Sequence, residues 1–476
     1  ILSGGPSETP VEMPPAETDP PPAGRPGVNR PEDWPKTAPL AGMLKYDPTP
    51  QVAHKTLDNG LKVMVVANHE TPFVTVQLRL RAGAWTEAKP GAAAMAMAML
   101  TKGTEKRSEA DFTEELETYA IGMNGSGEMD SAAVYAGFLT EHTERAMKLL
   151  AEAVLEPAFN EDELAKLKQQ VSTELALRSA EPSYIADRAF RRQLYGDHPY
   201  ARMTQGETTD VAALNVDDLR DWYEQFARPD MAWLIFAGDI DLDSAAVLAA
   251  KVFGQWQAEG EKPDVILPPL PEPAKTQIYL VNTPGTQAQI RIGQIGITRN
   301  HPGYFTAVVT SGYFGGSFGS RINKAVRVEK GLTYGAWGNY TTQRLAGAIQ
   351  AGTFTNIDTV PEAIQTVLNE FERLRDVPPD DTELGDTKTF LIGSFAGRRE
   401  TPQQVGGDVW LVESEELPGD YFQRMMDHIA KVGGEACAGL AQKTVDTDRL
   451  VIVVTGPADT LKPELEKIAP VSVAAL

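Results

Sequence analysis

Cysteine and basic residues are scarce in this chain of 476 residues. Cys437 is the only cysteine, which excludes an internal disulfide, a zinc site built from cysteines and an iron–sulfur cluster held by this chain alone. Lys and Arg number 44 against 66 Asp and Glu, so the net charge is −22. Because so acidic a surface repels phosphate backbones and anionic lipids, we do not expect nucleic acid as a partner.

Long apolar runs are also missing. No run reaches the roughly 18 residues that a membrane-spanning helix needs, so the sequence predicts no transmembrane segment. The first residue is Ile1 rather than Met, for which removal of an export signal and trimming of the sequence are both explanations.

Proline is concentrated at the beginning of the chain. Thirteen of the 34 prolines fall within the first 50 residues, with few large apolar residues between them. Such a composition favours extended polyproline conformations over a packed core. We therefore predict that residues 1–48 form an extended tether or strap, either one that holds an enzyme away from an envelope surface or a plain flexible leader.

In the rest of the chain, the same succession of apolar patterns occurs twice. Alternating and helical periodicities predict strands, then an apolar helix, then a strand and two more helices. The predicted elements are 61–66, 74–80, 91–100, 132–139, a helix from about 141 and 161–176, then 278–281, 289–295, 304–313, 346–354, a helix entered through Pro361, and 382–394. The repeated order indicates an α+β protein made of two homologous domains from a duplication, each a mixed β-sheet packed with helices. We place these domains at residues 49–261 and 276–476, joined by a proline-rich linker at 262–275.

The helix predicted at 91–100 lies between two recognisable flanks. It is preceded by Arg81-Ala82-Gly83-Ala84-Trp85 and followed by Lys102-Gly103-Thr104-Glu105-Lys106-Arg107-Ser108. This segment resembles the metal-binding region of the pitrilysin/insulinase family of zinc metallopeptidases. In that family the helix carries H-x-x-E-H, in which two histidines bind zinc and the glutamate is the base for a zinc-bound water.

The residue types of that motif are absent here. Aligning the flanks puts Ala94 and Ala98 at the histidine positions and Met97 at the base position, and all three are chemically inert. The family's third ligand falls at or near Glu174, which is either retained or an ordinary helix carboxylate. The six histidines are too far apart in sequence to form a helical pair elsewhere: His54, His69, His142, His198, His301 and His428. The resemblance therefore implies no cofactor or metal in this chain.

A second segment runs from Phe314 to Tyr334 and contains Gly315-Gly316-Ser317-Phe318-Gly319. It is similar to the family's C-terminal-domain segment, in which an arginine and a tyrosine seven residues apart reach back toward the zinc site. Matching residue by residue gives Arg327 and Tyr334, with Arg321 as the second choice for the arginine. By the resemblance, the guanidinium holds substrate carbonyls and the phenol donates to the oxyanion of the tetrahedral intermediate. Without the family resemblance, the sequence indicates that Arg327 is a surface helix residue and that Tyr334 is a strand residue in a sheet core.

The glycine-rich stretch has two interpretations of its own. Gly315, Gly316 and Ser317 are candidates for a substrate-contacting loop, and a helix-to-helix turn with close backbone packing is the alternative. A phosphate loop is not indicated, because no Gly-Lys-Ser/Thr follows.

Bacterial two-chain members of this family divide the work between a zinc-motif chain and a chain with the arginine–tyrosine pair. The resemblance implies that this chain is of the second kind. It would be inactive alone and would form a heterodimer with a homologous H-x-x-E-H chain that holds the zinc and acts on peptides. The absent Met, the proline-rich leader and the habit of the family together lead us to expect the periplasm or envelope of a bacterium.

Two other functions stay open. One is a non-enzymatic scaffold or peptide-binding protein derived from the peptidase fold, like the family members that became core subunits of respiratory complexes. The other is an autonomous peptidase with a Ser-His-Asp triad assembled in space, for which no local motif argues. The proteins that co-purify with the chain would separate the heterodimer subunit from the scaffold: a zinc-bearing relative favours the first, and a membrane complex or nothing favours the second.

Overall fold

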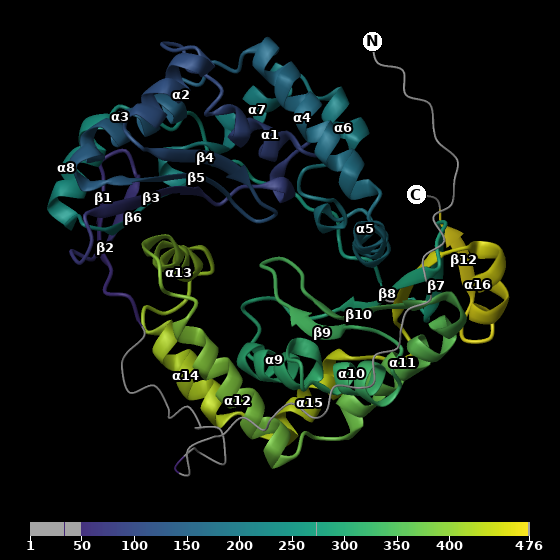
Figure 1. Ribbon diagram of the computed structural model, residues 1–476. Helices are drawn as coiled ribbons and strands as arrows, with labels where there is room; N and C mark the ends of the chain where they lie inside the picture. Colours follow the sequence, from purple (N-terminus) through teal and green to yellow (C-terminus); the bar gives the residue numbers. More distant parts are fainter. Residues whose placement is uncertain (1–32, 34–48, 273, 475–476) are drawn as a thin grey trace, which may run out of the picture. The chain divides into compact units, whose positions relative to one another are not determined.

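Two six-stranded sheets with corresponding strand orders form the framework of the structure (Figure 1). This computed structural model describes residue 33, residues 49–272 and residues 274–474. Apart from residue 33, the proline-rich segment predicted at 1–48 lies outside the described residues. We call residues 53–253 the first half and residues 277–474 the second half.

The first sheet has the order β1-β2-β6-β3-β5-β4. Its strands are β1 (Ala53–Thr56), β2 (Lys62–Ala67), β3 (Phe73–Leu80), β4 (Gly122–Gly127), β5 (Ala132–Leu139) and β6 (Ala232–Gly238). Strands β2 and β6 pair in parallel and the other neighbours are antiparallel, so the sheet is mixed. Among the strands that the structure describes, β4 lies at the edge of this sheet and pairs only with β5.

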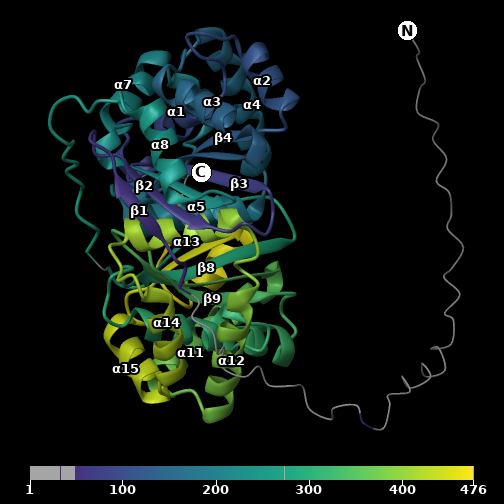
Figure 2. The same cartoon turned by 90° about the vertical axis from the view of Figure 1, so that its left-hand side faces the viewer.

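Helices cover one face of this sheet, where α3 contacts β5, α8 contacts β2 and α1 contacts β4 (Figure 2). The helices of the first half are α1 (Ala92–Met99), α2 (Glu109–Thr118), α3 (Thr143–Leu155), α4 (Glu161–Ser179), α5 (Pro182–Tyr195), α6 (Thr208–Ala213), α7 (Val216–Phe226) and α8 (Leu242–Phe253). Several begin at a capping side chain, as α4 does at Asn160 and α7 at Asn215. Their apolar faces bury the main core of this half.

The second sheet has the order β12-β7-β11-β8-β10-β9, which repeats the first position by position except at β12. Its strands are β7 (Gln277–Asn282), β8 (Gln287–Ile295), β9 (Ala336–Thr341), β10 (Ala348–Asn356), β11 (Val451–Gly456) and β12 (Val471–Ala474). Strand β12 runs parallel to β7, whereas β1 runs antiparallel to β2. Strand β9 is the unpaired edge that corresponds to β4.

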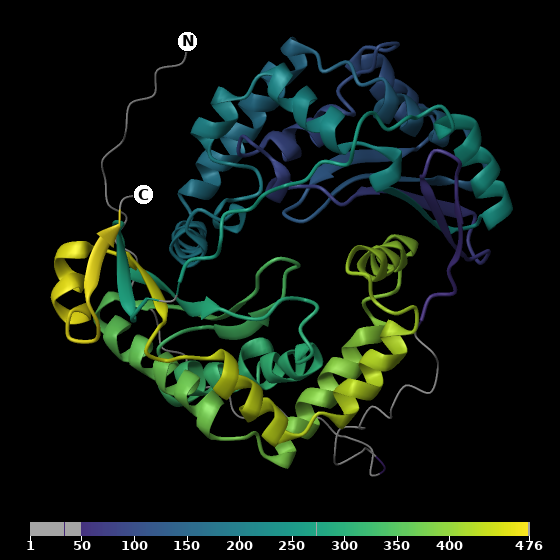
Figure 3. The same ribbon diagram turned by 180° about the vertical axis from the view of Figure 1, so that it is seen from behind.

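The helices of the second half repeat the pattern of the first half, and α11 packs on β8 and β10 (Figure 3). They are α9 (Tyr304–Ser311), α10 (Arg321–Asn323), α11 (Val360–Asp376), α12 (Asp381–Ala396), α13 (Pro402–Ser414), α14 (Tyr421–Lys431), α15 (Gly434–Thr444) and α16 (Ala458–Leu465). Two π-helical turns, η5 (Gly312–Gly316) and η6 (Lys324–Glu329), continue α9 and α10. None of the helices that the structure describes combines the length and apolar character needed to cross a membrane.

One helix from each half packs on the sheet of the other half. Helix α5 contacts β8 and β11, and α13 contacts β3 and β6. The ion pair between Asp187 on α5 and Arg291 on β8 (2.5 Å) belongs to the first contact. The rings of Trp410 on α13 and Trp233 on β6, with centroids 5.3 Å apart, belong to the second. Each half therefore buries part of its sheet only with the help of the other half.

The α+β fold with two homologous domains is confirmed, and each predicted element has a counterpart. Strand β5 occupies the predicted range 132–139, and α9 begins at Tyr304 as expected. Many further elements were not predicted, among them strands β4, β6, β9 and β11 and helices α5 and α13. Strand β4 reads Gly-Met-Asn-Gly-Ser-Gly, and its three glycines hide the strand because they have low strand propensity.

Candidate functional site

Helix α1 begins at a left-handed glycine and a buried carboxylate. Gly91 has a φ of 86°, a conformation that favours glycine. Glu87 accepts hydrogen bonds from the backbone N–H groups of Gly91 (2.9 Å) and Ala93 (3.0 Å), which otherwise lack partners at a helix start. This is how the chain sets the position of the helix that carries the degenerate motif.

The three motif positions on α1 offer no ligand to zinc. The Met97 side chain is 1% exposed and belongs to the core of the first half, while Ala94 and Ala98 are half-buried methyl groups. Zinc needs nitrogen, oxygen or thiolate ligands, so these residues do not fit it. Among the described residues, no three His, Cys, Asp or Glu side chains gather closely enough to hold a metal ion.

Strand β4 crosses α1 at backbone-to-backbone distance. A Cβ atom added to Gly125 would lie 1.9 Å from the carbonyl oxygen of Met97, and one added to Gly127 would lie 2.7 Å from the Cα of Ala94. Such contacts require glycine because any side chain would clash. The glycines that obscured this strand in the sequence are therefore what brings it onto the helix.

Glu174, the position of the third ligand, lies on α4. Its carboxylate forms an ion pair with Arg178, one helical turn away, at 2.7 Å, and both side chains are more than two-fifths exposed. Pairs of this kind contribute about 0.3–0.5 kcal/mol to helix stability. In the structure Glu174 thus acts as a surface helix carboxylate.

Arg327 lies in η6 and is half-buried. Its guanidinium carbon is 4.7 Å from the ring centroid of Phe318, within the range of a cation–π contact. Within the described part of the chain its guanidinium makes no hydrogen bond or ion pair, so its N–H donors are available to a ligand. Sequence reasoning missed Phe318, although an aromatic residue inside a glycine-rich stretch is a signal for it.

Tyr334 is presented to solvent just before the edge strand β9. Its side chain is 82% exposed and lies in the irregular segment between η6 and β9, rather than in a strand of the sheet core. Gly331, with a φ of 64°, ends the turn that carries Arg327: its N–H donates to the carbonyl of Arg327 (3.1 Å). Arg327 and Tyr334 thus lie on one short, hydrogen-bonded stretch of backbone.

Arg321, the second choice for the basic residue, is buried and fully engaged. Its Nε and Nη2 atoms donate to the two carboxylate oxygens of Glu383 (2.9 and 2.7 Å), and Nη1 donates to the carbonyl of Val377 (2.9 Å). Its donors therefore anchor α12 and are not free for a substrate. This geometry leaves Arg327 as the better candidate.

The glycine-rich stretch combines close packing with an exposed turn. A Cβ added to Gly315 would lie 1.9 Å from the N of Gly338 on β9, so Gly315 serves backbone packing. Gly316 is exposed, and Ser317 accepts a hydrogen bond from the N–H of Ser320 (3.1 Å). A pocket of about 520 Å³ opens beside Ser317 and Phe318, against α12.

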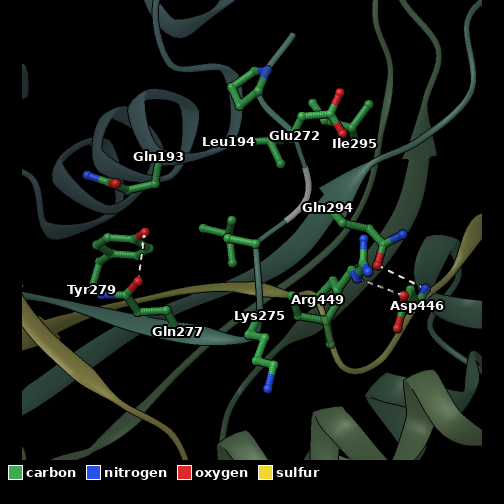
Figure 4. A pocket seen from close by; sticks show the side chains of 14 residues that line it. Gln193, Leu194, Glu272, Lys275, Gln277, Tyr279, Gln294, Ile295, Asp446 and Arg449 are labelled. Atoms are coloured by element: carbon green, nitrogen blue, oxygen red, sulfur yellow. Dashed lines mark hydrogen bonds and ion pairs between the residues drawn. The ribbon is translucent and has the colours of Figure 1, made fainter.

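A second pocket, of about 300 Å³, lies between α5, the end of the linker and the second sheet (Figure 4). Its polar side chains mostly pair with one another: Tyr279 donates to Gln277 (3.3 Å), and Gln294 accepts from the N–H of Asp446 (3.0 Å). The described residues that line it include none of the candidate site residues.

Comparison with known proteins agrees with this picture. A family model described as insulinase (peptidase family M16) matches residues 62–208, and a model described as peptidase M16 inactive domain matches residues 213–391. Between them the two matches run almost without a gap through most of both halves.

Similar proteins come from several bacteria. The chain is 26% identical to the uncharacterized zinc protease YmxG of Bacillus subtilis over 347 residues, which is 71% of this chain and 82% of that protein. It is 23% identical to the non-peptidase homolog YmxG of Helicobacter pylori over 389 residues, 79% of this chain and 87% of that one.

A solved structure shares the fold. The crystal structure of a peptidase M16 inactive domain from Pseudomonas fluorescens superimposes with a TM-score of 0.79 at 25% identity, covering 85% of this chain and 98% of that one. On the two model matches and the duplicated fold, the chain belongs to the M16 (insulinase) family of peptidases.

Proposed function

We propose that this chain is the zinc-less subunit of a heterodimeric zinc metalloendopeptidase. A homologous partner with an H-x-x-E-H helix holds the zinc, and this chain supplies Arg327 and Tyr334 to the substrate bound there. One contrast carries the proposal: the motif positions on α1 have no ligand atoms, whereas Arg327 and Tyr334 are accessible and have unused donors.

The two side chains suit peptide hydrolysis. The planar guanidinium of Arg327 can donate to backbone carbonyls of an extended peptide and hold it in place. The phenol of Tyr334 can donate to the oxyanion that forms when the scissile carbonyl is attacked. Removing such a donor typically lowers the rate by about 10²- to 10³-fold.

The surface around the pair has the character of an interface. Phe318, Val328 and Tyr334 are 70%, 63% and 82% exposed, and Phe390 lines the same pocket as Phe318. Large apolar side chains that stay exposed along one segment, here residues 318–334, are a feature of interaction sites. This supports burial of the region against a partner chain or a peptide.

The free edge of β9 adds a means of holding the substrate. It begins two residues after Tyr334, and among the described strands it has a neighbour on one side only. An extended peptide can add to such an edge through backbone hydrogen bonds, with specificity from alternate side chains.

The test is reconstitution with an H-x-x-E-H chain. We expect the isolated chain to bind no stoichiometric zinc and to cleave no peptide, and the mixture to cleave. Tyr334→Phe should lower kcat of the mixture about 10²-fold and leave the mass of the assembly unchanged. The matched control is Tyr119→Phe, a half-buried tyrosine of the first half that stacks on Arg145 and should leave kcat unchanged.

Two results would overturn the proposal. One is cleavage by the rigorously purified single chain, and the other is full turnover by the Tyr334→Phe mixture. If the chain co-purifies with a membrane complex instead of a zinc-bearing relative, the non-enzymatic scaffold is the better account.

A further inference from the structure

We propose that Thr353 and Thr355, two buried threonines on β10, are positioning residues for Tyr334. They hold the backbone on both sides of Tyr334, so that its phenol is presented in one place before the partner and substrate arrive. This inference rests on the role proposed above for Tyr334.

The two hydroxyls straddle Tyr334. Thr355 Oγ1 donates to the carbonyl of Leu332 at 2.7 Å, and Thr353 Oγ1 donates to the carbonyl of Gly335 at 3.1 Å. Both threonines are only 2% exposed. Because side chains two residues apart in a strand point to the same face, β10 delivers both hydroxyls to one loop.

The rest of the loop is also fixed through its backbone. The N–H of Leu332 donates to the carbonyl of Val326 (3.0 Å), and the N–H of Gly335 donates to Thr333 Oγ1 (3.2 Å). Between these anchors the Tyr334 side chain is exposed and has no partner among the described residues. The backbone is thus held while the phenol is left unpaired, which is the arrangement that preorganised catalysis requires.

A buried side chain also holds the backbone near Arg327, the other member of the pair. The buried Asn323 donates from Nδ2 to the carbonyl of Phe318 (2.6 Å), whose ring lies against the Arg327 guanidinium. The same carboxamide accepts from the N–H of Ala336 at 3.5 Å, a long contact at the start of β9. Buried side-chain groups therefore support the backbone near both members of the pair.

Precision at this position matters for rate. A shift of about 1 Å in a catalytic group can cost on the order of 10²-fold. Replacing each hydroxyl by a methyl group removes one donor: the Leu332 carbonyl loses the bond from Thr355, and the Gly335 carbonyl is left with the bond from Thr333 Oγ1 (3.0 Å). The expected consequence is a loosened loop in a chain that is otherwise folded.

The first experiment needs only the full-length chain. In the Thr353→Val/Thr355→Val variant we expect backbone amides 331–336 to exchange with deuterium at least tenfold faster, as measured by mass spectrometry. Thr353→Ser/Thr355→Ser retains both hydroxyls and should keep wild-type exchange. The control is Thr75→Val, which removes a similar bond from a buried threonine to the carbonyl of Ala237 (3.2 Å) in the first half and should leave amides 331–336 unchanged.

The second experiment measures turnover by the mixture with the zinc-bearing chain. The double valine variant should lower kcat about tenfold or more and change KM less than twofold. In a Tyr334→Phe background the same substitutions should cause no further loss, whereas a general loss of stability would still lower the activity. If the double variant fails to fold, each single valine variant is tested in the same two ways.

The outcomes separate the two hypotheses. Unchanged exchange at amides 331–336 overturns the positioning role whatever the activity shows. Faster exchange with unchanged turnover also overturns it, provided that Tyr334→Phe lowers turnover. If Tyr334→Phe itself has no effect on turnover, the proposed function fails and the positioning role fails with it.

Discussion

Glu87 is the residue on which the start of helix α1 depends. The residue is 6% exposed, and its two carboxyl oxygens accept two backbone N–H groups of the helix start. Burial raises its pKa from an ordinary value of 4.5 to about 8, although the hydrogen bonds from Ala93 and Gly91 act in the opposite direction. The folded chain therefore retains a proton on Glu87 at pH values where the unfolded chain has released it.

This pKa predicts how stability varies with pH. Between about pH 4.5 and pH 8 the folded state binds more protons at Glu87, so its contribution to stability is complete below the unfolded pKa and is lost as pH rises toward 8. The loss approaches at most about 1.4 kcal/mol per pH unit. In Glu87→Gln this slope should disappear, which urea unfolding of both proteins from pH 5 to pH 8 would measure. Parallel pH profiles for the two proteins would contradict the assignment.

Arg321 and Arg327 show how environment separates two arginines six positions apart. Arg321 is 3% exposed, and its guanidinium donates hydrogen bonds to Glu383 and to backbone carbonyls. Arg327 is held only by a ring face and keeps its donors free of any described partner. Residue type alone could not separate these roles, because both arginines belong to the same motif-bearing segment.

At the scale of elements, the contact between β4 and α1 depends on glycine. Gly125 faces the Met97 carbonyl so closely that no side chain fits between strand and helix. The corresponding edge strand of the other sheet does the same at Gly315 and Gly338. Close packing of an edge strand is thus a repeated feature of the duplication.

We predict that Gly125→Ala destabilises the protein strongly. The added methyl group would lie 1.9 Å from a backbone oxygen, so strand or helix must move, at a cost of at least about 1–3 kcal/mol in the free energy of unfolding. The matched control is Gly122→Ala in the same strand, where the nearest atom is 3.8 Å away and the change should stay within about 0.5 kcal/mol. Chemical denaturation measures the free energy of unfolding of both variants. Equal losses in the two variants would show that the contact of Gly125 with Met97 is not tight.

At the scale of the whole molecule, α5 and α13 link the two halves. Helix α5 buries Ile185, Phe190 and Leu194 in a cluster with Val281 and Val453 of the second sheet. Helix α13 buries Val409 and Trp410 with Met64, Trp233 and Ile235 of the first sheet. Because each helix completes the core of the other half, neither sheet is fully covered by its own half.

This exchange predicts coupled unfolding. Trp410→Ala should cost about 3–5 kcal/mol and should also split or broaden the calorimetric transition, because α13 no longer ties the second half to the first. Phe112→Ala removes a fully buried ring that lies within the core of the first half. It should lower the transition temperature by a similar amount and leave one transition. A single sharp transition in Trp410→Ala would show that α13 does not couple the halves.

Much of the fold followed from local patterns. The period-2 alternation at 74–80 and the helical spacing from Ala146 to Val154 both correspond to observed elements, β3 and α3. Strand β9 was missed because Ala-Trp-Gly-Asn-Tyr-Thr lacks a continuous apolar pattern. Helices α5 and α13 were missed as bridging elements because a sequence does not show which sheet a helix will cover.

The amino-acid sequence alone determined that the motif positions of α1 hold no zinc ligands, since alanine and methionine at positions 94, 97 and 98 lack the nitrogen, carboxylate or thiolate atoms that zinc needs. It also placed Arg327 and Tyr334 seven residues apart. Only the tertiary structure decided that Tyr334 is exposed to solvent and that Thr353 and Thr355 donate to the carbonyls of Gly335 and Leu332 on either side of it. The reason is physical: ligand chemistry belongs to each side chain, whereas exposure and hydrogen-bond partners arise from segments that meet only when the chain folds.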